Sequence, residues 1–173
     1  MKFALDGYAL DYNGDYPGLP DGFSGIPTSN DYLGQLFSAG ETQFRVIFWV
    51  KDSPVCTENA PIDPGRVASD ATGVLGPGQC HWAYMSGQKS SSHPDRALLL
   101  DPFLPDTTEF DPDLWDRKAI VLEIDGSAKA RRWRISDNQI LDDTNQDILS
   151  AEAEAWKADR EDPMDFLVQP RPR

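Results

Sequence analysis

Two cysteines are the residues whose type and spacing most directly suggest chemistry. Cys56 and Cys80 bracket a segment rich in proline and glycine. In an oxidising compartment such a pair forms a disulfide, worth roughly 3.5 kcal/mol in the loop-entropy account. In the cytosol the same residues would be two reduced thiols in the core. We expect the disulfide, because an irregular loop of this length has little else to hold it.

Neither zinc binding nor hydrolysis is favoured by the remaining motifs. Cys56, Cys80, His81 and His93 match no CxxC or HxxxH spacing, and adjacent residues on a strand point to opposite faces. The run 90–95 contains Ser, His and Asp, but consecutively in a polar turn, whereas the members of a catalytic triad converge from separate elements. There is no GxSxG elbow, no GxGxxG and no Walker motif. We therefore expect no catalytic residue, no metal site and no cofactor.

The loop 101–116 is the one segment that invites a calcium hypothesis. It holds six acids and no base, and calcium takes six to eight oxygen ligands. The candidate ligands are Asp106, Thr108, Glu109, Asp111 and Asp113. The loop lacks the D-x-D-x-D-G spacing of an EF-hand and contains three prolines, so a solvated loop is the favoured interpretation.

The composition predicts a folded, acidic chain. It has 173 residues, 39% of them hydrophobic, which suits one domain with a real core. The formal net charge of −13 argues against nucleic-acid binding, because such a surface repels phosphate backbones. No run approaches the roughly 18 apolar residues of a membrane span, and no secretory leader is evident.

Hydrophobic periodicity predicts the elements that position these groups. A capped helix is expected at 31–37 and a longer one at 143–160. Strands are expected where apolar residues alternate or cluster, with the clearest hairpin turning at Asp125-Gly126. The expected strands are 44–50, 81–86, 97–100, 119–124 and 128–135, and the segment 166–168 is expected to dock near the end.

The first eighteen residues predict a helix with two unlike faces. Leu5, Tyr8 and Tyr12 share one face at helical spacing and are expected to pack on the sheet, whereas Phe3 and Leu10 are offset from it. Asn13-Gly14 is a typical helix stop. No capping residue precedes the pattern, so it also suits the end of a longer helix whose first part has been removed.

This stretch resembles the helix-to-loop junction of type IV pilin-like proteins, in particular type II secretion pseudopilins. The pattern A-L-x-x-Y-x-x-D-N-G-x-Y-P is matched, with Tyr12 as an extra residue, by Ala4, Leu5, Tyr8, Asp11, Asn13, Gly14, Tyr16 and Pro17. Four further blocks are similar to pilin-like proteins of the Verrucomicrobia and related bacteria: SNDYLGQLF, GQCHWAYMSG, ALLLDPF and KAIVLEIDGSAK.

The resemblance implies an α+β, pilin-like fold: a truncated N-terminal helix packed on an antiparallel sheet of about four strands, plus a C-terminal helix. Residues 1–13 would be the remnant of the long helix and 14–173 the globular head of a single domain. It implies a non-enzymatic filament subunit of the cell envelope, anchored in the inner membrane before assembly. Its partners would be other subunits and a prepilin peptidase. A location outside the cytosol favours the disulfide, and major pseudopilins bind calcium in a C-terminal loop.

Two other functions remain open on the residues alone. A secreted or periplasmic module could bind glycans by stacking sugars on exposed aromatic rings, and an enzyme is a more distant option. The candidate stacking residues are Trp49, Trp82, Tyr84 and Trp115. Aromatic residues at strand spacing more often belong to the core.

Overall fold

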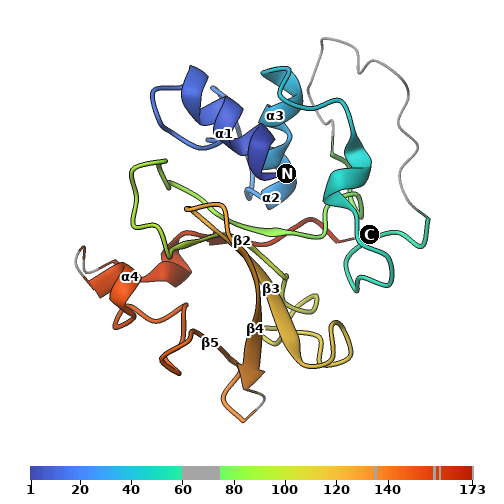
Figure 1. Ribbon diagram of the computed structural model, residues 1–173. Helices are drawn as coiled ribbons and strands as arrows, with labels where there is room; N and C mark the ends of the chain where they lie inside the picture. Colours follow the sequence, from blue (N-terminus) through green and yellow to red (C-terminus); the bar gives the residue numbers. More distant parts are fainter. Residues whose placement is uncertain (60–74, 135, 158, 160, 173) are drawn as a thin grey trace.

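The centre of the structure is a six-stranded antiparallel sheet that curls into a half-barrel (Figure 1). The computed structural model describes residues 1–59, 75–134, 136–157, 159 and 161–172. The strand order is β5-β4-β3-β2-β1-β6. The strands are β1 (Ala83–Met85), β2 (Ala97–Leu100), β3 (Lys118–Glu123), β4 (Ala128–Arg134), β5 (Gln139–Leu141) and β6 (Leu167–Val168).

The hairpin of β3 and β4 forms where the sequence predicted it. Ile120 pairs with Ala130, and the turn is made at Asp125-Gly126, where Gly126 has a φ of 91°. A left-handed φ of this kind is readily adopted by glycine, which has no Cβ. The Asp125 side chain accepts a 2.7 Å hydrogen bond from the amide of Ser127 and so fixes the turn. Residue 135, the last of the expected return strand, lies outside the described residues.

Both faces of the sheet contribute to apolar cores. The first core joins helix side chains such as Leu5 and Leu36 to Tyr84 and Leu98 of the sheet. The second gathers Trp133, Trp156 and other apolar side chains. Burial on two faces explains why β2, whose four residues are all buried, reads as a continuous apolar run rather than an alternating one.

Three short helices cover the first core: α1 (Lys2–Asp11), α2 (Ser29–Leu33) and α3 (Gln35–Ser38), as Figure 1 shows. Thr28 caps α2 in a reciprocal capping box with Asp31. The helix expected at 31–37 is therefore present but begins earlier and is divided at Gly34. Among the described residues, no helix is long and apolar enough to cross a membrane.

The expectation of a pilin-like α+β fold is wrong. The sheet has six strands instead of about four and curls on itself, and α1 is one short helix among several rather than a long spine. The expected C-terminal helix at 143–160 is reduced to α4 (Glu154–Lys157), with residues 158 and 160 outside the described range. The structure is mainly β, with little helix.

Local hydrogen bonds explain why the last expected helix does not start. The carboxylate of Asp142 accepts the backbone amides of Thr144 and Gln146 at 2.7 and 2.9 Å. A side chain that captures nearby amides in this way offers the backbone an alternative to a helix. The chain continues through turns as far as α4. After α4, a 3₁₀ helix, η2 (Pro163–Asp165), precedes β6.

The strand expected at 44–50 is also wrong, because this run forms a 3₁₀ helix, η1 (Arg45–Phe48). Phe48 alone of these four residues is fully buried, and its carbonyl accepts the amide of His81 at 2.8 Å. A short apolar run has no periodicity that separates a strand from a helical turn.

Candidate functional site

Helix α1 carries apolar side chains on two opposite faces. Leu5 and Tyr8 are buried, as the sequence predicted. Tyr12, which was expected to pack with them, is instead 48% exposed and stacks on Tyr8 with ring centroids 4.0 Å apart. Phe3 is 93% exposed and Leu10 84% exposed. These two side chains are seven residues apart, which is about two helical turns, so they point in nearly the same direction. We call them the outer face of α1.

Contacts at both ends hold α1 against the sheet. At its start, the Lys2 side chain lies over the hairpin turn, since a Cβ on Gly126 would sit 3.5 Å from Cε of Lys2. Just beyond its end, the amide of Tyr16 donates to the carbonyl of Gln88 at 3.2 Å, and Asp15 forms a 2.8 Å ion pair with Lys89, both in the connection between β1 and β2. The outer face is therefore presented by a helix fixed at both ends.

Both cysteines are buried free thiols, so the structure does not contain the expected disulfide. Cys80 is fully buried, and its Sγ lies 3.9 Å from the hydroxyl oxygen of Ser29. Burial raises the pKa of the Cys80 thiol from 9.0 to about 12. Of the segment between the cysteines, residues 60–74 lie outside the described residues.

The buried thiol makes stability sensitive to alkaline pH. The pKa of Cys80 is raised on folding, so its stabilising contribution is complete below about pH 9 and is lost as pH rises toward 12. We expect the free energy of unfolding to fall by up to about 1.4 kcal/mol per pH unit through this group. Urea unfolding at several pH values between 9 and 10 should show the free energy of unfolding falling less steeply with pH for Cys80→Ala than for the unchanged chain, because the tyrosines ionise alike in both proteins.

If the free energy of unfolding falls equally steeply with pH in the two proteins, Cys80 is not a free thiol. A count of thiols in the denatured, unreduced protein separates the two states directly. Two thiols per chain agree with the structure, whereas none would restore the disulfide that the sequence favoured.

The acidic loop 101–116 does not gather its carboxylates into a cation site. Asp106, Glu109 and Asp113 are exposed, and Asp111 accepts the amide of Asp113 at 2.9 Å. Among the described residues, the group of acids close enough to share an ion lies elsewhere, at Asp95, Glu123 and Asp125, with ligand atoms within 4.8 Å of one another.

Glu123 in that group is already neutralised by two cations. It is 1% exposed, and its carboxylate pairs with Arg131 through one oxygen and with Lys129 through the other, at 2.7 Å. The hydroxyl of Ser127 donates a third contact at 2.9 Å. A metal ion would have to displace these partners, so the arrangement is better described as a buried ion-pair network on the β3–β4 hairpin.

A second buried network joins side chains far apart in the sequence. His81 lies between Ser53 and Asp101, with Nδ1 2.8 Å from the serine hydroxyl and Nε2 2.6 Å from the aspartate. Asp101 also accepts the amide of Ile120 at 2.7 Å and the indole N–H of Trp115 at 3.2 Å. No motif in the sequence marks these residues as a group.

The side chains of Ser53, His81 and Asp101 are hydrogen-bonded in the sequence of a hydrolase triad, but a substrate cannot reach the serine. All three side chains are buried, and the oxygen of Ser53 already accepts the amide of Val55 at 3.3 Å. A nucleophilic serine must face its substrate. The network instead ties the segment around Ser53 to β2 and β3. By contrast, His93 of the run 90–95 lies in a turn and its Nδ1 accepts the amide of Asp95 at 3.3 Å.

The aromatic residues considered for sugar stacking do not form a shared platform. Tyr84 is completely buried and donates its hydroxyl to the carbonyl of Pro17 at 2.9 Å. Trp49 and Trp82 are partly buried, and Trp82 packs edge-on against His81. Trp115 is 41% exposed, and its indole nitrogen donates to Asp101. None of the four is favoured as a glycan site.

The comparisons with known proteins add no relative: no family model, no curated protein and no solved structure matches the chain.

Proposed function

We propose that the chain is a non-enzymatic structural subunit of a cell-envelope filament, of the type IV pilus or type II secretion pseudopilus class. Its α1 would contact neighbouring subunits through the outer face. The observation that carries the proposal is the pair Phe3 and Leu10, almost fully exposed on the opposite side of the helix from the buried Leu5.

A helix that is apolar on two opposite faces is typical of a helix that packs between two apolar surfaces. One partner is the first core of this chain, which contains Leu5 and Tyr8. The other, we infer, is the corresponding helix of a second copy. Covering these two large side chains would bury apolar surface, and each Å² buried stabilises the assembly by about 25 cal/mol. The entropy lost on association opposes this gain.

The sequence blocks that resemble pilin-like proteins also support this class, in which a hydrophobic helix assembles the filament. The proposal does not rest on the fold, because the structure lacks the architecture expected of that family. Inner-membrane anchoring, processing by a prepilin peptidase and contacts with other subunits belong to the same proposal.

Self-association through α1 can be tested on the chain itself. We expect sedimentation velocity at rising protein concentration to show reversible oligomers that are weakened at least tenfold by Phe3→Ser combined with Leu10→Ser. Ile26→Ser is the matched control, because Ile26 is 90% exposed but lies in the loop between α1 and α2 rather than on α1. It should leave association unchanged.

Cross-linking gives a second readout of the same surface. A cysteine placed at Leu10 should join two chains under mild oxidation, whereas one placed at Ile26 should not. A chain that stays monomeric at millimolar concentration and forms no cross-link through position 10 would contradict the proposal.

A further inference from the structure

One face of the β3–β4 hairpin carries an excess of positive charge, although the chain as a whole has a net charge of −13. Lys118 of β3 and Arg132 of β4 lie directly opposite each other, and both are exposed. Arg134, two residues further along β4, shares their face because side chains alternate along a strand. We call these three residues the basic face.

The basic face is poorly neutralised within the chain. Arg134 forms a 2.7 Å ion pair with Asp137, whereas Arg132 donates only to the amide oxygen of Asn145. Lys118 forms no ion pair among the described residues. Like charges directly opposite each other on paired strands are destabilising, so the placement of Lys118 and Arg132 favours an acidic partner.

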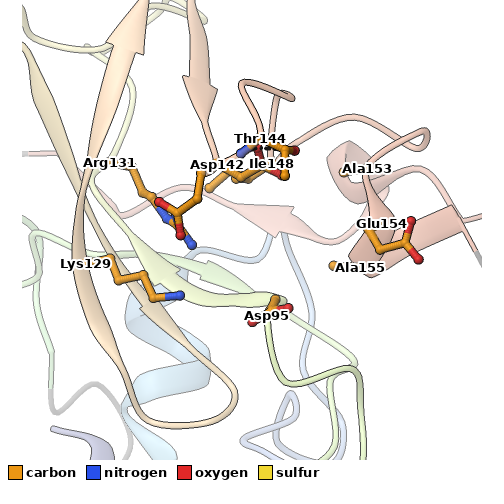
Figure 2. A pocket seen from close by; sticks show the side chains of 10 residues that line it. Asp95, Lys129, Arg131, Asp142, Thr144, Ile148, Ala153, Glu154 and Ala155 are labelled. Atoms are coloured by element: carbon orange, nitrogen blue, oxygen red, sulfur yellow. Dashed lines mark hydrogen bonds and ion pairs between the residues drawn. The ribbon is translucent and has the colours of Figure 1, made fainter.

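The other face of the same hairpin is neutralised differently. Figure 2 shows Lys129 and Arg131, the alternate residues of β4, reaching toward Asp142. Both also pair with the buried carboxylate of Glu123. These two cations therefore have acidic partners inside the chain, in contrast to those of the basic face.

The acidic loop 101–116 packs on the face of the sheet opposite the basic face. Its Phe110 lies in the second core and meets the ring of Trp133 edge-on, with ring centroids 6.1 Å apart. Trp133 follows Arg132 in β4, so the two side chains point to opposite faces. Three exposed acids of the loop form no ion pair among the described residues: Asp106, Glu109 and Asp113. One chain thus presents acids on one side of its sheet and cations on the other, held apart by the sheet itself.

We propose that the basic face binds the acidic loop 101–116 of a second copy of the chain. The contact joins two different surfaces, so it repeats head to tail and extends an assembly. The inference rests on the proposed filament role and adds a second contact to the one made by α1. Repulsion between two acidic chains opposes it at low salt. At physiological ionic strength, charges more than about 8 Å apart are screened, whereas partly buried pairs in contact are screened much less.

Charge variants test this contact apart from the outer face of α1. All are made in a chain that already carries Phe3→Ser and Leu10→Ser, which we call the serine background. Sedimentation velocity at about 0.15 M salt measures their association. Adding Lys118→Glu and Arg132→Glu, the basic-face variant, should weaken association at least about tenfold, because attractions become repulsions.

The matched control makes the same change in net charge elsewhere. Lys51→Glu combined with Lys157→Glu replaces two exposed lysines outside the hairpin and should leave association nearly unchanged. The basic-face variant keeps like charges opposite each other on β3 and β4, so its free energy of unfolding should match that of the control.

A loop variant identifies the partner surface. Asp106→Asn, Glu109→Gln and Asp113→Asn together remove three charges and should also weaken association when this variant is alone. Mixed in equal amounts with the basic-face variant, it should form complexes of two chains that grow no further. Such a mixture holds one type of intact basic face and one type of intact loop, each on a different chain.

The outcomes separate this contact from the one made by α1. Raising the salt from about 0.15 to about 0.5 M should weaken association of the serine background, but not association through apolar side chains. If the basic-face variant and its control associate equally, or if the mixture stays monomeric, the inference is overturned while the proposal for α1 stands. Charge-dependent association that Phe3→Ser and Leu10→Ser leave at full strength would support this contact and contradict the role of α1.

Discussion

Replacing Glu123 with leucine is expected to lower the free energy of unfolding by about 3–5 kcal/mol. The carboxylate is 1% exposed and faces Arg131, which is itself nearly buried. Removing the acid leaves Arg131 in the interior with only the exposed Asp143 as a charged partner, and that penalty exceeds any gain from the added apolar surface. Urea unfolding with an unchanged m-value measures the loss.

Two further variants identify the cause. Glu123→Leu combined with Arg131→Met removes both charges and should recover most of the lost stability, as replacing a whole buried pair often does. Lys129→Met removes the outer partner, whose side chain is 33% exposed, and should cost no more than about 1 kcal/mol. A double variant no more stable than Glu123→Leu would mean that packing, not charge, is responsible.

Replacing Asp101 with alanine should cost about 3–5 kcal/mol, because one fully buried and two partly buried donors lose their acceptor together. These are Nε2 of His81, the indole N–H of Trp115 and the amide of Ile120. Each buried donor left unpaired costs about 1–3 kcal/mol. Chemical denaturation gives the value, and the exposed Asp113→Ala in the same segment is the control.

A loss below about 1 kcal/mol for Asp101→Ala would show that water or a rearranged loop satisfies the three donors. The companion variant Ser53→Ala should be much milder, because His81 can keep its hydrogen bond to Asp101. The two variants together separate the anchoring of the sheet from the anchoring of the segment around Ser53.

The parts of the fold that the sequence predicted are those decided by local chemistry. Asp125-Gly126 requires a turn, Asn13-Gly14 stops α1, and the apolar run 97–100 forms β2. The parts that failed did so for two different reasons. Residues 44–50 have strand composition, but no strand among the described residues pairs with them. The helix expected at 143–160 loses its first turn to a local competitor, the side chain of Asp142, which accepts nearby amides.

One signal in the sequence could have indicated the buried ion pair. Glu123 lies two residues from Val121 and four from Ala119, so strict alternation puts it on the buried face of β3. A charged residue on a buried face needs a partner of opposite charge, and Arg131 lies on the paired strand. The network of Ser53, His81 and Asp101 has no comparable signal, because its members come from three separate segments.

The two edge strands of the sheet, β5 and β6, determine whether chains can aggregate by pairing their sheets edge to edge. β6 has two residues and is followed by Pro170, which cannot donate to a ladder, while the amide of Ile148 donates to Ile140 of β5 at 2.8 Å. Long bare edges template the strand-by-strand addition that ends in amyloid. Here one edge is too short and the other is covered by its own chain, so fibrous aggregation by edge pairing is disfavoured at both ends of the sheet.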